Sequence, residues 1–135
     1  MKISTIILCL LISATSFAQE EWGSLNKNKL TMKQIAPIWP GCEAGNSTKR
    51  DACFNEMLMK HIVANFKYPA NEYKNNIQGE VVVDFVINTK GVVEIKSASG
   101  GNKGLQEAAK KNISSIPKMK PGMFGGKPSA VPYTV

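Results

Sequence analysis

The sequence has few of the residues from which metal centres and catalytic sites are built. Its 135 residues include one histidine, His61, and three cysteines, none of them in a Cys-x-x-Cys pair. A structural zinc site needs four such ligands, and a dithiol redox site needs the close pair. The chain also lacks a nucleophile-elbow glycine motif, and its acidic residues have no paired context. We therefore expect no enzymatic activity, no catalytic residue, no metal site and no cofactor.

Long apolar runs are also missing, apart from one at the start of the chain. Residues 3–12 are largely apolar, follow the positive charge of Lys2, and lead to the small-x-small pattern Ser16-Phe17-Ala18. The run is short for a membrane span of about 20 residues. We therefore expect residues 1–18 to be a signal peptide that is cleaved between Ala18 and Gln19. The alternative is an uncleaved membrane anchor.

The rest of the chain is long enough for one domain and too short for two. Residues 19–36 are polar, contain no proline and show no sustained hydrophobic period. We interpret them as a linker or a loosely held arm. Residues 37–135 carry the periodic segments and form the expected folded domain.

The chain is basic, with a formal net charge of +7. Its lysines are scattered, and the only dense run is Lys118-Met119-Lys120. No nucleic-acid-binding motif accompanies this charge, so we expect no nucleic-acid partner. A basic exported domain is attracted weakly to anionic envelope surfaces such as lipid headgroups or cell-wall polymers.

Two cysteines, Cys42 and Cys53, remain after cleavage of residues 1–18. An exported compartment is oxidising, which favours a disulfide between them. The bridge would close a loop of about 12 residues and stabilise the fold by roughly 3 kcal/mol. Two free thiols and half of a metal site are the alternatives.

A helix is predicted to begin at Thr48 or Asp51 and to run to about Lys67. Thr48 or Asp51 is the expected N-cap, with an acidic residue three positions after Thr48. The helix should end at Lys67 to Pro69, because proline disfavours helical geometry at the residue before it. One apolar stripe recurs every four residues along it: Phe54, Leu58, Ile62 and Phe66.

Two single residues near this helix have both a structural and a functional interpretation. Trp39 lies in a turn-rich strap, residues 37–42, and is expected to cover the edge of the core; stacking on a ligand is the alternative. His61 lies on or near the apolar stripe and is expected to be a satisfied histidine at the core edge. The alternative for His61 is a ligand or a catalytic base.

Residues 81–97 predict a β-hairpin. Alternate residues of its first strand are all apolar, which requires one covered face. We expect a three-residue loop, Thr89-Lys90-Gly91, with Gly91 in the left-handed conformation. The expected pairs are Ile87–Val93, Phe85–Ile95 and Val83–Ser97 on the apolar face, and Asp84–Lys96 on the other.

A second helix and a third strand complete the expected fold. Residues 105–116 have helical period and end at Pro117, and residues 118–128 read as a loop. Residues 129–135 are expected to form a strand that lies at a sheet edge, because Pro132 cannot donate to a ladder. The predicted class is α+β, with two helices packed on one face of a three-stranded antiparallel sheet.

Short motifs follow one another from the strap to the predicted last strand. They are Pro37-Ile38-Trp39-Pro40-Gly41-Cys42-Glu43, Cys53-Phe54-Asn55, Tyr68-Pro69, Ile77-Gln78-Gly79-Glu80-Val81, Phe85-Val86-Ile87, Gly91, Leu105, Glu107-Ala108, Pro117-Lys118-Met119-Lys120-Pro121-Gly122 and Gly126-Lys127-Pro128. Each is weak alone, but their order and spacing over residues 37–135 resemble the C-terminal domain of TonB. That domain is the periplasmic part of the energy transducer of Gram-negative envelopes. The paired cysteines are similar to those of a cysteine-containing branch of the family.

The resemblance implies binding of a partner by strand addition during TonB-dependent transmembrane transport. Such domains grip a segment of an outer-membrane receptor as an added strand, so the implied partner is a TonB-dependent receptor or another envelope protein. A homodimer formed through the edge strand is a further expectation. The implied partner-binding residues lie in the last strand: Ser129, Ala130, Val131, Tyr133 and Val135.

One difference from the family favours an alternative function. Relatives carry an uncleaved membrane helix and a proline-rich spacer, whereas residues 19–36 contain no proline. The alternative is a stand-alone secreted envelope module that binds cell-wall polymer or a periplasmic protein without energy transduction. The expected location is periplasmic or secreted after cleavage, and the inner membrane if residues 1–18 are retained.

Overall fold

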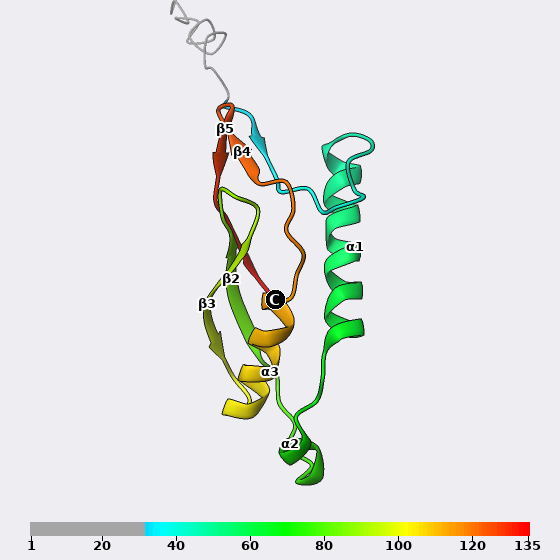
Figure 1. Ribbon diagram of the computed structural model, residues 1–135, viewed down its shortest axis with the longest axis vertical. Helices are drawn as coiled ribbons and strands as arrows, with labels where there is room; N and C mark the ends of the chain where they lie inside the picture. The colour runs from blue at the N-terminus through cyan, green and yellow to red at the C-terminus, as the bar shows by residue number, and fades with distance from the viewer. Residues whose placement is uncertain (1–31) are drawn as a thin grey trace, which may run out of the picture. The chain divides into compact units, whose positions relative to one another are not determined.

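The computed structural model describes residues 32–135. The predicted signal peptide, its cleavage site at Ala18 and Gln19, and most of the predicted arm 19–36 lie outside the described residues. The described elements, which can be followed in Figure 1, are β1 (Gln34–Ile35), α1 (Ser47–Asn65), α2 (Ala70–Lys74), β2 (Val82–Ile87), β3 (Val93–Ser99), α3 (Lys103–Ser114), β4 (Gly122–Phe124), β5 (Lys127–Ser129) and β6 (Val131–Thr134).

The central sheet is antiparallel, with β2 between β3 and β6. On β2, Val83, Phe85 and Ile87 are at most 2% exposed, whereas the residues between them are half-buried. Phe54 of α1 and Ile113 of α3 belong to the same hydrophobic core as these side chains, so both helices cover one face of the sheet. The predicted α+β fold, with two helices on one face of a three-stranded antiparallel sheet, is confirmed.

A second, smaller sheet joins β1, β4 and β5, with β4 in the middle. The prediction that residues 118–128 form a loop is therefore wrong from residue 122 onward, where β4 and β5 form a hairpin. The end of the segment interpreted as an arm, Gln34–Ile35, is β1 and pairs with β4. The pairing extends into the strap, since the N–H of Ile38 donates to the carbonyl of Lys120 at 3.0 Å and the reverse bond measures 3.2 Å.

The start of α1 differs from the expectation. Asn46 is the N-cap: its backbone is extended, and its side chain accepts a hydrogen bond from the N–H of Lys49 at 3.0 Å. The expected caps, Thr48 and Asp51, both lie inside the helix. Asparagine is among the strongest N-cap residues, and the helix therefore begins two residues earlier than a Thr48 cap would place it.

The apolar stripe of α1 packs as predicted along most of its length. Phe54 and Leu58 are buried, and Ile62 packs against the same core. Phe66 is the C-cap and is 37% exposed, so the helix ends just before the predicted stop.

The hairpin confirms the predicted loop but only half of the predicted register. Gly91 has φ +78°, and the pairs Ile87–Val93 and Phe85–Ile95 form. A bulge between Asp84 and Phe85 then shifts the ladder by one residue. Beyond it, Asp84 lies opposite Ser97 rather than Lys96, and Val83 lies opposite Ala98 rather than Ser97. The expected Asp84–Lys96 pair is therefore wrong.

The second predicted helix is α3. Asn102 caps it by accepting a hydrogen bond from the N–H of Leu105 at 2.9 Å, and the helix ends before Pro117. Its buried residues are Leu105, Asn112 and Ile113. The polar member, Asn112, donates from Nδ2 to the carbonyl of Ile62 at 2.9 Å and so ties α3 to α1.

Candidate partner-binding edge

The strand β6 lies at an edge of the central sheet. It pairs with β2 on one side, and within residues 32–135 no strand lies on its other side. The ladder continues one residue past the strand, because Val83 and Val135 each donate an N–H to the other's carbonyl, at 2.8 and 3.1 Å. The prediction that Pro132 lies in an edge strand is confirmed.

Alternation along β6 decides which main-chain groups face away from β2. In an antiparallel pair, residues that exchange both hydrogen bonds alternate with residues that exchange none. Counted from Val135, the groups of Tyr133 and Val131 also face β2, whereas those of Pro132 and Thr134 face outward. We call these outward groups the open flank; they comprise the N–H of Thr134 and the carbonyls of Pro132 and Thr134. The missing N–H of Pro132 costs the sheet no hydrogen bond.

The inward side chain of β6 is an aromatic ring inserted in the core. Tyr133 is stacked against Phe54 of α1, with ring centroids 5.0 Å apart, and against Phe85 of β2 at 5.5 Å. Burial raises the pKa of Tyr133 to about 12, with a smaller contribution from Asp51. This stack fixes the position of β6 relative to α1.

Tyr133 should make stability depend on alkaline pH. Its neutral phenol is favoured in the folded state, so its contribution is complete below the ordinary pKa of about 10 and is lost as the pH rises toward 12. We expect the wild-type protein to lose more unfolding free energy than Tyr133→Phe between about pH 9 and about pH 11. Urea unfolding of both proteins at each pH measures this, and equal losses would contradict the assignment.

The solvent face of the sheet carries a polar contact that spans all three strands. The carboxylate of Asp84 on β2 accepts hydrogen bonds from Thr134 Oγ1 on β6 at 2.6 Å and from Ser97 Oγ on β3 at 2.8 Å. Both hydrogen bonds lower the pKa of the Asp84 carboxyl group, and the bond from Thr134 has the larger effect. Ionised Asp84 therefore holds the end of β6 in register at neutral pH.

The residues expected to bind a partner lie in different environments. Ser129 belongs to β5, where it pairs with Gly122, and Ala130 lies between β5 and β6. Val131, Tyr133 and Val135 direct their main-chain groups to β2. Partner contact by any of the five residues stays a prediction.

The open flank itself consists of Pro132 and Thr134, which the sequence-derived set omits. The sequence shows that neighbouring residues of a strand face opposite ways, but it does not say which of them face outward. One known pair with β2 decides this.

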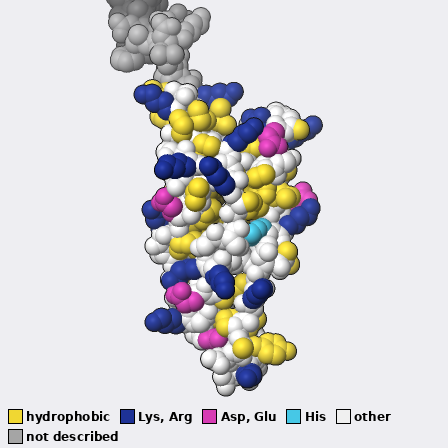
Figure 2. Space-filling view, in the orientation of Figure 1, with side chains coloured by type: hydrophobic (Ala, Val, Ile, Leu, Met, Phe, Trp, Pro, Cys, Tyr) yellow, Lys and Arg dark blue, Asp and Glu magenta, His cyan; other side chains and the backbone are white. Residues whose placement is uncertain are grey.

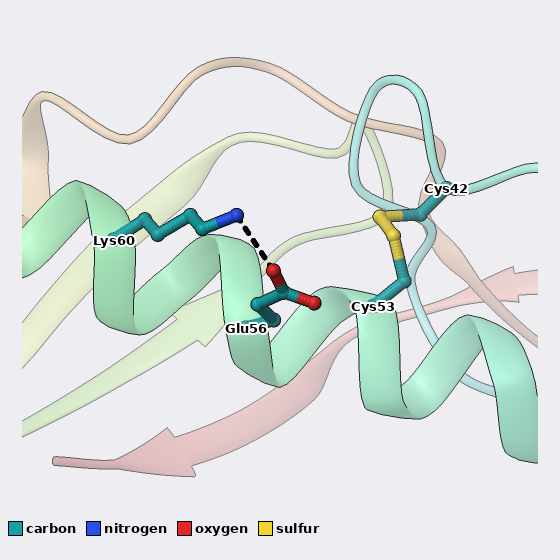
Figure 3. The surroundings of a disulfide bond; sticks show 4 residues. All are labelled: Cys42, Cys53, Glu56 and Lys60. Atoms are coloured by element: carbon teal, nitrogen blue, oxygen red, sulfur yellow. Dashed lines mark hydrogen bonds and ion pairs between the residues drawn. A yellow bond between two sulfur atoms is a disulfide. The ribbon is translucent and has the colours of Figure 1, made fainter.

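The predicted disulfide is confirmed. Cys42 in the strap is bonded to Cys53 on α1, with Cα atoms 5.7 Å apart (Figure 3). The N–H of Cys42 also donates to the carbonyl of Trp39 at 2.9 Å, which closes a turn. One helical turn beyond the bridge, the Lys60 ammonium lies 2.6 Å from a Glu56 carboxylate oxygen, and both side chains are exposed. The disulfide fastens the strap to the start of α1.

Trp39 and His61 both have structural surroundings. Trp39 is 4% exposed and makes edge contacts with Phe54 and His61, so it has no ring face free for a ligand. His61 Nε2 lies 3.1 Å from the carbonyl oxygen of Asn112, and Nδ1 lies 3.3 Å from Asn65 Nδ2. Because a carbonyl only accepts, Nε2 donates and Nδ1 accepts, so both ring nitrogens are used at the core edge.

The described part of the chain shows no basic patch, metal-binding cluster or membrane-spanning helix that would indicate a further site. Figure 2 shows lysine and arginine side chains spread over the visible face, with no single basic patch. Among residues 32–135, no three His, Cys, Asp or Glu side chains are grouped so that they could hold a metal ion. Within the same range, no helix has the length and apolar character needed to cross a membrane.

Comparison with known families places the edge strand in context. Residues 64–135, more than half of the chain, match the family model described as Gram-negative bacterial TonB protein C-terminal. The chain belongs to this family. The TonB C-terminal match includes the whole central sheet, α3 and the hairpin of β4 and β5. The strap and both cysteines precede the matched residues, so the resemblance over residues 37–63 stays a prediction.

The comparison with solved structures also gave a match. It is the NMR solution structure of the TonB C-terminal domain of Helicobacter pylori, with 21% identity and a TM-score of 0.41, covering 69% of this chain and 95% of that chain. No curated protein matches the chain.

Proposed function

We propose that this TonB C-terminal domain binds an extended segment of an outer-membrane transport protein as an added strand on the open flank of β6. The observation that carries the proposal is the geometry of β6, an edge strand whose outward main-chain groups have no partner strand within residues 32–135. Membership of the TonB C-terminal family supports the same class of role.

The open flank favours a short and selective ladder. Thr134 is the only residue of β6 that both donates and accepts outward, because Pro132 has no N–H. A guest strand therefore gains few hydrogen bonds along β6, each contributing about 0.5–1.5 kcal/mol net. Main-chain bonds of this number give modest affinity, so guest side chains must supply much of the selectivity.

Thr134→Pro tests the proposal directly. It removes the outward N–H, and Tyr133 already has the extended backbone that a following proline requires. We expect roughly threefold to tenfold weaker binding of short synthetic receptor-plug peptides, measured by fluorescence anisotropy. Thr134→Ala is the matched control, because it removes the same hydroxyl contact with Asp84 but keeps the N–H.

A second measurement leaves the protein unchanged. Peptides that bind are N-methylated on alternate residues, in two complementary sets. Strand addition uses the N–H groups of one set only, so one set should lose binding and the other should keep it. Equal effects of the two sets, or equal affinities of Thr134→Pro and Thr134→Ala, would overturn the proposal.

The proposed location is the periplasm, after cleavage between Ala18 and Gln19. The Cys42–Cys53 disulfide supports an oxidising compartment. Fractionation of cells that produce the full chain checks this, with release into the periplasmic extract as the expected result. Retention in the inner membrane would instead support an uncleaved anchor.

A further inference from the structure

The central sheet has two edges, and they differ in regularity. β6 pairs with β2 without interruption along its whole length. β3 forms the other edge (Figure 1), and among the described residues no strand pairs with its outer side. On β3, Ile95 pairs with Phe85, whereas the next residue of β2, Asp84, pairs with Ser97. Lys96 therefore has no residue opposite it on β2 and is the extra residue of the bulge.

The bulge interrupts the alternation of side chains along β3. Val93, Ile95 and Ala98 lie on the covered face, where each packs against the hydrophobic core. Lys96 and Ser97 are consecutive, yet both are exposed. In a regular strand, consecutive side chains lie on opposite faces. Without Lys96, β3 would alternate along its whole length.

The first half of β3 directs main-chain groups outward in the regular way. Across the hairpin, the N–H of Asn88 donates to the carbonyl of Val92 at 2.9 Å. Residues whose main-chain groups face a partner strand alternate with residues whose groups face away from it. Counted from Val92, the N–H and carbonyl groups of Val93 and Ile95 therefore face away from β2.

Beyond the bulge, the outward groups continue at a different spacing. Val83 of β2 exchanges two hydrogen bonds with Val135, on the β6 side. Its partner on β3, Ala98, therefore directs its main-chain groups outward. The step between outward residues is two from Val93 to Ile95 and three from Ile95 to Ala98. A regular guest strand presents its groups every two residues, so it cannot pair with both halves of β3.

The charge of Lys96 is compensated within β3. Its Nζ lies 3.4 Å from Glu94 Oε2, and both side chains are about half exposed, at 55% and 49%. The edge thus presents an ion pair and no lone positive charge. The obstacle to an added strand is therefore the spacing of main-chain groups.

We propose that the bulge at Lys96 closes the β3 edge to strand addition, so that an added strand, from a guest or from a second copy of the chain, pairs only with β6. Bulges are one of the devices by which proteins keep edge strands from pairing. The irregularity lies in the β2–β3 ladder alone and leaves the β2–β6 ladder regular. This inference rests on the proposed function for the role of β6 and explains why the other edge is not used.

Deletion of Lys96 tests the inference. It restores the alternation of side chains and the two-residue step, so β3 becomes a regular edge strand. Two such edges can pair antiparallel, with Val93, Ile95 and Ala98 of one copy next to those of the other. The comparison is made in a Thr134→Pro background, which weakens pairing through β6. We expect the deletion to make self-association at least about tenfold tighter than in the Thr134→Pro parent, measured by analytical ultracentrifugation.

Lys96→Ser is the matched control, because it keeps the bulge and removes the ammonium group. In the same background it should self-associate no more tightly than the parent. Equal association of Lys96→Ser and the deletion variant would show that charge closes the edge. A deletion variant that is folded by circular dichroism but associates like its parent would show that the bulge has no such role. Either result would overturn the inference.

A second deletion keeps the test decisive if removal of Lys96 impairs folding. Deletion of Ser97 also removes the bulge, and it places Lys96 opposite Asp84 as an opposite-charge cross-strand pair. The lysine is then retained while the outward step becomes regular. This variant should self-associate like the first deletion variant. Association no tighter than that of the parent would contradict the proposal.

A measurement on the unaltered protein separates this inference from the proposed function. A receptor-plug peptide is added in excess, and NMR follows the main-chain amide signals. Signals of β6 should change, whereas those of Val93, Ile95 and Ala98 should not. Changes at both edges would overturn the inference and leave strand addition to β6 standing. If neither edge responds, the proposed function fails, and the association of the two deletion variants still decides whether the bulge closes β3.

Discussion

Gly91→Ala is expected to destabilise the protein by at least about 3 kcal/mol. A Cβ atom at this position would lie 1.7 Å from the carbonyl oxygen of Met119. That oxygen belongs to the backbone, and the N–H of Met119 donates to the carbonyl of Gly91 at 3.0 Å, so the two segments cannot separate without losing this bond. Gly91 also has φ +78°, a conformation that is strained for alanine.

Gly126→Ala separates the two causes. Gly126 has φ +80°, but a Cβ atom there would meet nothing within 4 Å. This variant should lose only the conformational term, about 1 kcal/mol. Urea unfolding followed by circular dichroism compares the midpoints of both variants with that of the wild type. If the two variants lose the same free energy, the hairpin loop does not pack against Met119 as described.

Loss of the disulfide is expected to cost about 3 kcal/mol, within a usual range of 2–5 kcal/mol. The bridge joins residues 11 positions apart, and Cys42 is 3% exposed. Cutting it frees the strap from α1, and the strap carries buried Trp39 and the Ile38–Lys120 bridge to the small sheet. We expect faster amide exchange in the strap and at the start of α1 as well as a lower unfolding midpoint.

Two forms of the experiment distinguish the covalent bond from the packing of its sulfurs. The double variant Cys42→Ala, Cys53→Ala removes both, whereas dithiothreitol on the wild-type protein breaks only the bond. Similar losses show that the bond itself stabilises the fold. An unchanged midpoint in the reduced wild-type protein would mean that the strap is held by Trp39 and its neighbours alone.

Local chemistry was sufficient to predict much of this fold. A four-residue apolar period predicts α1, and strict alternation with Gly91 predicts the hairpin loop. The exclusion of proline from a ladder places Pro132 at an edge. Each of these inferences needs only the geometry of one element and its own residues.

Register beyond the hairpin loop could not be obtained in that way. At the bulge, Asp84 accepts hydrogen bonds from Ser97 and Thr134, two residues on different strands that local pattern does not bring together. The small sheet was also missed, because strands of two or three residues have no readable alternation. Alternation along β6 does not by itself say which of its main-chain groups face outward. One known pair with β2 is needed to decide this.

By itself, therefore, the sequence determined α1 and α3, the hairpin loop, the disulfide pair and the edge position of the last strand, but not the short helix α2. Tertiary structure decided the bulge, the second sheet, and the open flank of Pro132 and Thr134. Periodicity and turn chemistry act between near neighbours in the chain. The features decided by tertiary structure arise where residues distant in the chain meet as partners, such as Asp84 with Thr134 and Gln34 with Phe124.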